Sequence, residues 1–385
     1  MKQFSHNNAI PNVILALGAE QRLTAAARRS SCIQTDNSEK TRWACHKTVL
    51  AGSSPYFGAM FQSEFRESGA TIVFLPRGIF TAAALDGILH YMYTNEIDTH
   101  IPGSTAEITT PAALDLLQNI YSAGDYLGMT SLCDAAADRM AGMTHRWNCY
   151  CASCVDTVPR LLLFTSAQSQ SLDDERMAHM TENALKILTS NLPKTLQSFW
   201  TSRELAHLIK YFPETGRSLT QQVLLRINKS NAIESLYACY QAAQTLSQKD
   251  AEGTWSKVLN DNLSMIQSRA IQTLAIHFNF YCSQYPTLLS CIDGIKYSFE
   301  FLEHILQQTL AEQMDSHNAG IFYQGIVRHL MCRHAVQHCE KVRVILQEAK
   351  SSILHFISSR VSEIKESGDF EVLDRGVVSL LAQGK

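Results

Sequence analysis

HKTVLAGSSPYFGAMF, residues 46–61, is the stretch that decides the fold of this chain. Its apolar side chains recur at helical spacing on both sides of a Gly-Ser-Ser corner. They are Val49, Leu50, Tyr56, Phe57, Met60 and Phe61. Ser54 followed by Pro55 supplies an N-cap and a favoured first helical residue. We therefore predict two short helices, the second beginning at Pro55.

The flanking segments predict a small sheet. Short strands are expected at residues 31–35, at residues 41–44 with Trp43, and at the apolar run 71–75, which ends at Pro76. Residues 36–38 read as a turn and 102–105 as a loop. Before them, Val13, Ile14, Leu17 and Leu23 recur at roughly helical spacing after Pro11, which predicts an N-terminal helix reaching about residue 27.

Helices are expected after the third strand. One starts near Phe80, and two more cover the apolar positions between residues 114 and 133. From Leu161 to the end of the sequence the periods are helical and strand-like runs are almost lacking. Two faint internal echoes within this region suggest two related helical units.

The stretch at 46–61 resembles the core signature of the BTB/POZ domain. The segment YMYTNEI at 91–97 and the closing pattern AGDYLGM at 123–129 resemble further parts of that family, so the resemblance runs from about Ser31 to Met140. It implies an α+β domain, a small sheet packed with helices. Six positions of the signature carry structural roles by this resemblance: His46, Lys47, Leu50, Ser54, Pro55 and Phe57.

The helical segment behind this domain resembles the BACK domain of substrate adaptors and is longer than a single BACK unit. The expected organisation is an N-terminal helix or tail at 1–27, a BTB/POZ domain at 28–141, a Cys-rich connector at 142–160 ending near Pro159, and a mainly α-helical BACK-like region at 161–385.

A protein-docking motif is implied by the same resemblance. Phe65-Arg66-Glu67 resembles the hydrophobic-x-acidic motif by which BTB adaptors dock on the N-terminal helices of cullin-3. An apolar side chain can fill a groove between partner helices, while a carboxylate fixes orientation. The expected cullin contacts are Met60, Phe61, Phe65, Glu67 and Tyr126. The alternative is that Phe65 completes the core, Glu67 is solvated and Tyr126 is simply packed.

A cysteine cluster follows the domain. His145, Cys149, Cys151 and Cys154 offer three thiols and an imidazole within ten residues, a ligand set that suits a structural zinc ion. The segment from Cys332 to Cys339, with His334 and His338 one helical turn apart, is an alternative source of a fourth ligand. The other interpretation is that these are reduced thiols in a linker and that the protein carries no cofactor.

Bulk composition excludes several classes. The 385 residues are 45% hydrophobic and 18% charged, without a run of about 18 apolar residues, so we expect no membrane partner. A net charge of −3 without a basic block argues against nucleic acid. Eleven scattered cysteines and a start without a convincing signal segment favour an intracellular protein, cytoplasmic or nuclear.

We therefore predict a non-enzymatic adaptor, since no phosphate-loop, nucleophile-elbow or H-E-x-x-H motif is present. Its BTB domain would form a homodimer and bind cullin-3, and the helical region would present an unidentified protein substrate to the ubiquitin ligase complex. The alternative is a BTB dimerisation scaffold or transcriptional co-regulator without cullin binding. An enzyme with a zinc-centred site at the cysteine cluster is a third hypothesis.

Overall fold

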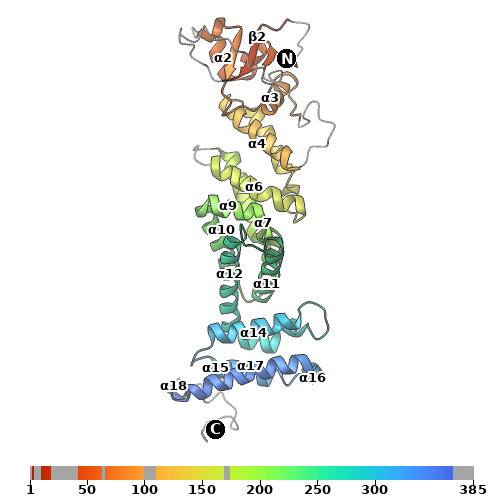
Figure 1. Cartoon of the computed structure of the whole chain (residues 1–385), viewed down its shortest axis with the longest axis vertical. Helices are drawn as coiled ribbons and strands as arrows, with labels where there is room; N and C mark the ends of the chain where they lie inside the picture. Colours follow the sequence, from red (N-terminus) through yellow and green to blue (C-terminus); the bar gives the residue numbers. More distant parts are fainter. Residues whose placement is uncertain are drawn as a thin grey trace. The chain divides into compact units, whose positions relative to one another are not determined.

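A computed structural model of the chain describes residues 2–3, 10–18, 42–62, 66–98, 110–168 and 174–366 (Figure 1). The chain divides into two compact units, Met1–Ala184 and Leu185–Lys385. Each unit is described by itself below. The division falls inside one helix, α7 (Glu175–Ser190).

Unit 1 contains a small sheet and a set of helices. Its strands are β1 (Lys2–Gln3), β2 (Val13–Leu17), β3 (Arg42–Cys45) and β4 (Ile72–Leu75). Its α-helices before α7 are α1 (Lys47–Ser53), α2 (Pro55–Gln62), α3 (Ala82–Thr94), α4 (Thr110–Tyr126), α5 (Thr130–Gly142) and α6 (Ala152–Gln168). Two short 3-10 turns complete it, η3 (Arg66–Gly69) and η4 (His145–Trp147).

The sheet has the strand order β1-β3-β2-β4. β2 is antiparallel to β3 and parallel to β4, so that Leu15 lies between Trp43 and Val73. β1 pairs parallel to β3. The strands expected at 41–44 and 71–75 are thereby confirmed, each displaced by one residue at its start.

The helix predicted from Pro11 was wrong where the structure describes it. Residues 13–17 form β2, an inner strand of the sheet, so the sheet begins before residue 28. Four of its five side chains are buried, which is the pattern of a strand covered on both sides. The rest of that predicted helix, the strand at 31–35, the turn at 36–38 and the loop at 102–105 lie outside the described residues.

The two short helices of the signature are confirmed. α1 ends at Ser53 and α2 begins at Pro55. The N-cap role predicted for Ser54 is also confirmed, since its Oγ accepts a hydrogen bond from the backbone N–H of Phe57 at 3.3 Å. Leu50 and Phe57 point into the core and are fully buried.

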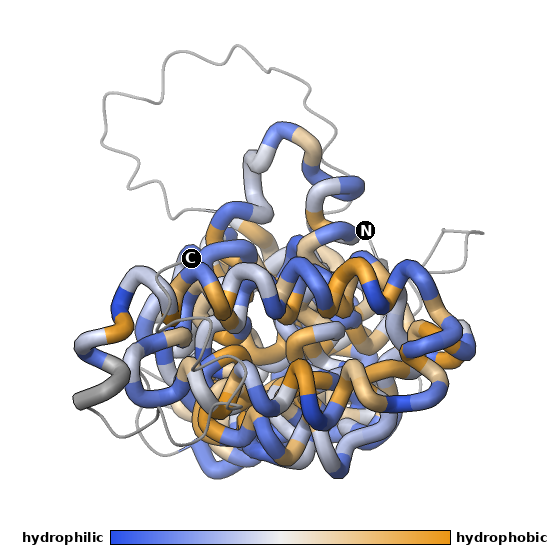
Figure 2. The backbone as a smooth tube through the Cα atoms, turned by 90° about the horizontal axis from the view of Figure 1, so that it is seen from below, coloured by the Kyte–Doolittle hydropathy of each residue, from blue (hydrophilic) through white to orange (hydrophobic). Residues whose placement is uncertain are grey.

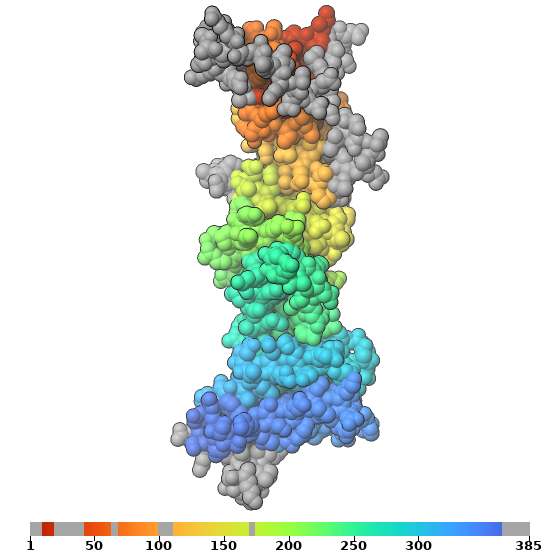
Figure 3. All heavy atoms as spheres, in the orientation of Figure 1, coloured from red at the N-terminus to blue at the C-terminus, as the bar shows by residue number. Residues whose placement is uncertain are grey.

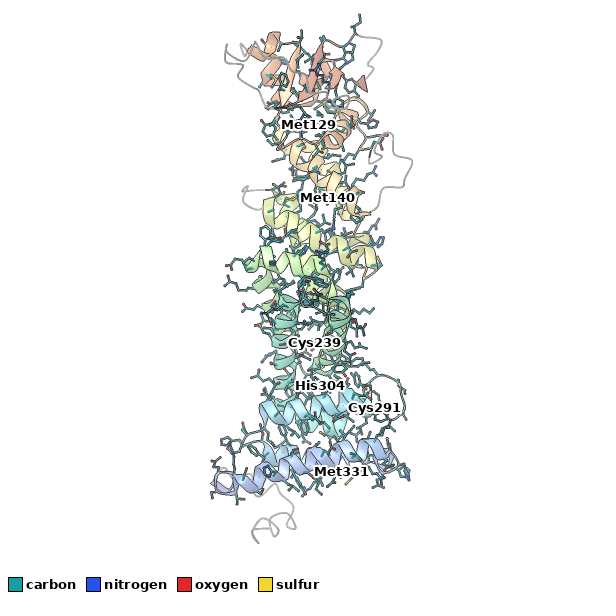
Figure 4. The ribbon with its side chains drawn as sticks, viewed as in Figure 1. Met129, Met140, Cys239, Cys291, His304 and Met331 are labelled. Atoms are coloured by element: carbon teal, nitrogen blue, oxygen red, sulfur yellow. The ribbon has the colours of Figure 1, made fainter. Side chains whose placement is uncertain are left out.

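The remaining helices of unit 1 close the same core. α3 begins two residues after Phe80, because Thr81 caps it by accepting the backbone N–H of Ala84 at 3.1 Å. Met129 and Met140, near the two ends of α5, are buried (Figure 4). The connector expected over 142–160 is not all loop, because α6 begins at Ala152 and continues through the buried Pro159.

Unit 2 is helical throughout its described residues, as predicted. Its α-helices after α7 are α8 (Leu192–Ser198), α9 (Arg203–Tyr211), α10 (Pro213–Arg226), α11 (Ala232–Lys249), α12 (Lys257–Ile276), α13 (Phe278–Gln284), α14 (Phe299–Gln313), α15 (Ala319–Gln324), α16 (His334–Gln337), α17 (Glu340–Ser359) and α18 (Val361–Glu366). Shorter turns are η5 (Phe199–Thr201), η6 (Pro286–Leu289) and the π-helical η7 (Gly325–Leu330).

Amphipathic helices build unit 2. Orange and blue segments alternate along the tube of the chain, as expected for helices with one apolar face (Figure 2). α14 packs against α17, and their atoms form neighbouring cyan and blue bands (Figure 3). The interior includes the fully buried Cys239 on α11 and the half-buried His304 on α14 (Figure 4). Phe199 and Trp200 are fully buried too, so this aromatic pair belongs to the core.

Candidate functional site

His46 opens the signature and is part of the fold. It is the N-cap residue of α1 and its side chain is buried. Its backbone N–H donates to the Tyr93 hydroxyl at 3.0 Å, and its Nδ1 lies 2.9 Å from the same oxygen. Burial raises the pKa of Tyr93 above its usual value. The imidazole therefore links α1 to α3.

Lys47 reaches across the end of α2. Its ammonium donates to the backbone carbonyl of Ser68 at 2.8 Å and lies 5.4 Å from the centre of the Phe61 ring. Phe61 is stacked on Phe57, with ring centres 5.8 Å apart and an interplanar angle of 8°. Lys47 therefore fixes both the Phe61 ring and the turn η3 that follows α2.

A row of partly exposed apolar side chains lies along α2 and the end of α4. The Tyr126 side chain is 42% exposed, and its ring lies 5.3 Å from Tyr56 and 5.7 Å from the buried Phe80. Met60 follows Tyr56 by one helical turn. We call Tyr56, Met60, Phe61 and Tyr126 the docking face. Three of these four residues were expected from the sequence.

Tyr56 was not among the contacts expected from the sequence, although its spacing of four residues from Met60 places it on the same side of α2. The side chains of the two remaining expected residues are not described. Phe65 lies outside the described residues, and of Glu67 only the backbone, within η3, is described.

The docking face is held together by contacts between α2 and the corner after α4. The Ser54 hydroxyl donates to the backbone carbonyl of Leu127 at 2.7 Å. Next to it, Gly128 has a φ of +71°, and a Cβ added there would lie 3.3 Å from the Pro55 ring. Glycine suits this position because side chains rarely adopt that φ and because α2 approaches so closely.

The cysteine cluster forms a second candidate site, in unit 1. The ligand atoms of His145, Cys149, Cys151 and Cys154 all lie within 4.8 Å of one another. Nδ1 of His145 is 3.4 Å from the Cys154 sulfur and 3.7 Å from that of Cys151. Four candidate ligand atoms therefore come together from one short segment, without a contribution from residues 332–339. His334 and His338 lie beside each other in unit 2, with their Nε2 atoms 3.1 Å apart.

The backbone of η4 turns the other way from a normal helix. His145, Arg146 and Trp147 have φ values of 49°, 56° and 60°. For residues with a side chain this conformation costs roughly 1–2 kcal/mol each. Thr144, which is fully buried, anchors the turn by donating to the Ala141 carbonyl at 2.7 Å and accepting the N–H of Trp147 at 3.3 Å. This turn places the His145 ring next to Cys151 and Cys154.

The thiols of the cluster differ in acidity. A hydrogen bond from the backbone N–H of Cys154 lowers the pKa of the Cys151 thiol to about 7. Burial raises the pKa of the Cys154 thiol to about 12. Cys149, Cys151 and Cys154 are all free thiols, and no disulfide joins any two of them.

The fold and the signature match a known domain family. Residues 32–142 match the sequence profile of the BTB/POZ domain, so this segment of the chain is a BTB/POZ domain. The helical region that follows fits the expected BACK-like region.

Curated relatives with this similarity are Kelch-like proteins. Over 53 residues the chain is 51% identical to Kelch-like protein 38 of Rattus norvegicus, and over 52 residues it is 54% identical to Kelch-like protein 38 of Homo sapiens. Each match covers 14% of this chain and 9% of the relative, within the BTB region. The chain therefore matches less than a tenth of the length of these relatives. Among the described helices, none has the length and apolarity needed to cross a membrane.

Proposed function

We propose that this chain is a non-enzymatic adaptor that binds cullin-3 through its BTB domain and brings a protein substrate to the ubiquitin ligase. The observation that carries the proposal is the docking face on α2 and the end of α4, where the BTB resemblance predicts cullin contacts. The similarity to Kelch-like protein 38 over the BTB region supports membership of the adaptor class.

The face suits a helical partner. Tyr126 and its neighbours on α2 are apolar and incompletely buried, and large aromatic side chains of this kind are the usual anchors of protein interfaces. Phe65 would fill a groove between the helices of cullin-3, and Glu67 would orient the complex through charge-assisted hydrogen bonds.

In this mechanism the chain brings the substrate close to the ligase. The BTB domain pairs with a second copy, the BACK-like region holds the substrate, and the partner ligase carries out ubiquitin transfer. Holding substrate and ligase together turns a bimolecular encounter into an effectively intramolecular one.

A binding titration against the N-terminal region of cullin-3 tests the proposal. The full chain is compared with a Phe65→Ala, Glu67→Ala double variant and with a Met60→Ala variant. We expect micromolar or tighter binding, weakened at least about 10-fold by each change if these residues are anchors. Tyr211→Ala is the matched control, because this tyrosine is 67% exposed and lies in unit 2.

Circular dichroism and size-exclusion chromatography must show that the variants are folded. If the folded wild-type chain does not bind cullin-3, the adaptor proposal fails. A dimeric chain that does not bind would favour the BTB scaffold or co-regulator.

A further inference from the structure

The two sulfur–nitrogen distances of the cysteine cluster match those around a tetrahedral zinc ion. With Zn–S bonds of about 2.3 Å and Zn–N bonds of about 2.0–2.1 Å, tetrahedral geometry separates sulfur from nitrogen by about 3.5 Å and sulfur from sulfur by about 3.8 Å. The two sulfur–nitrogen distances are 3.4 and 3.7 Å, and all four ligand atoms lie within 4.8 Å of one another. We propose that His145, Cys149, Cys151 and Cys154 bind a structural zinc ion.

The donor set determines the metal class. Three thiolates and one imidazole are ligands that select zinc over the hard cations magnesium and calcium. Binding converts each thiol into a thiolate and releases its proton to solvent, so that the bound ion and its ligands carry one net negative charge. With four protein ligands, no coordination position is left for a substrate, which is the arrangement of structural sites.

The unusual backbone supports the same inference. Three consecutive residues with side chains have positive φ, beginning with the ligand His145. Strained conformations of this kind persist where the surroundings impose them, and they cluster at functional sites. A metal bond to His145 would supply such a constraint, in addition to the buried Thr144.

The ion would join the end of α5 to the start of α6. His145 lies three residues after α5, whereas Cys154 lies in the first turn of α6 and is fully buried. Trp147, between them, packs against the hydrophobic core of unit 1. The proposed zinc therefore fixes where the chain leaves the BTB domain, a role independent of cullin binding.

Metal analysis of the purified full chain is the first test. We expect about one zinc ion per chain, as for a four-ligand structural site. Cys149→Ser and Cys151→Ser should each lose most of it, whereas Cys332→Ser, which changes an exposed thiol in unit 2, should retain it. A His334→Ala variant checks that the histidine pair of unit 2 does not account for the metal.

Cobalt substitution gives a readout that does not depend on a variant folding. The wild-type chain with Co²⁺ in place of zinc should show the strong visible absorption of tetrahedral cobalt–thiolate bonds. Chelation should then speed hydrogen exchange in residues 143–155 at least about 10-fold, because metal binding and local folding are coupled. A folded wild-type chain without stoichiometric zinc and without this absorption would overturn the proposal, as would a disulfide between two of the three cysteines.

Discussion

Replacing Ser54 by alanine should destabilise α2 and the docking face together. The Ser54 hydroxyl makes two hydrogen bonds inside the protein, accepting from the N–H of Phe57 and donating to the carbonyl of Leu127. The residue is 1% exposed, so water does not replace either bond without local opening. The change therefore removes a helix cap and a long-range link at once.

The magnitude follows from these two contacts. Loss of an N-cap costs about 1 kcal/mol, and a buried carbonyl left without its partner costs about 1–3 kcal/mol. The Leu127 carbonyl keeps a long contact with the N–H of Tyr56 at 3.5 Å, which favours the lower part of that range. We expect a total of about 2–3 kcal/mol, which is about a 30- to 140-fold change in an opening equilibrium.

Hydrogen exchange of the full chain, read by mass spectrometry, measures this effect locally. Amides of α2 and of residues 126–129 should exchange about 30- to 140-fold faster in Ser54→Ala, if opening of this region limits exchange. Ser53→Ala, one residue earlier at a half-buried position, is the matched control. Exchange of α2 within about threefold of wild type would refute the reasoning, since one tenfold step is already 1.4 kcal/mol.

Two further changes test packing and charge. Gly325→Ala should destabilise unit 2 by about 1–3 kcal/mol in chemical denaturation, because the added Cβ would lie 2.7 Å from the buried Phe278 ring. Asp174→Asn should reduce the acid sensitivity of unit 1, measured as melting temperature against pH. Burial acts to raise the pKa of Asp174, but hydrogen bonds from Tyr121 and Arg176 outweigh it and hold that pKa below its usual value. The stability from this carboxylate is therefore complete above its unfolded pKa of about 3.9 and is lost as the pH falls through the lower folded pKa.

A specific result would contradict each of these two predictions. Gly142→Ala is the control for Gly325, since an added Cβ there meets no atom within 4 Å. A Gly325→Ala chain more stable than wild type would mean that helix propensity outweighs the clash. For Asp174, an asparagine variant that loses stability below about pH 4 as steeply as wild type would contradict the assignment.

The two helices of the signature were predicted correctly because cap residues and apolar spacing are signals within a short stretch of sequence. Ser54 and Pro55 specify where α2 begins by cap chemistry, and the helical spacing of Leu50 and Phe57 places both in the core. The BTB assignment followed from this stretch. The docking face was only partly predictable, because the contact between Tyr56 and Tyr126 joins residues from two different helices.

The error over residues 13–17 has a physical cause. VILAL is a continuous apolar run, and such a run is compatible with a buried strand or a buried helix. Pro11 favoured the helix, because proline is common at the first position of a helix. The pairing partners that make it a strand are β3 and β4, and neither is visible in the local pattern.

The residues of the cysteine cluster could be predicted from the sequence, but their arrangement in space could not. The spacing of Cys149, Cys151 and Cys154 allows three thiols to meet, but it does not say whether His145 joins them. That depends on a turn in which three consecutive residues with side chains have positive φ, which is uncommon for such residues.

The link from Ser54 to Leu127 also constrains how the protein is made. During synthesis α2 leaves the ribosome long before the end of α4, and until then Ser54 lacks its acceptor and Tyr56 lacks its neighbour Tyr126. A nascent chain or a truncated product that ends before residue 126 therefore contains the whole signature without the assembled docking face. Only a chain that has been synthesised beyond this corner can assemble that face.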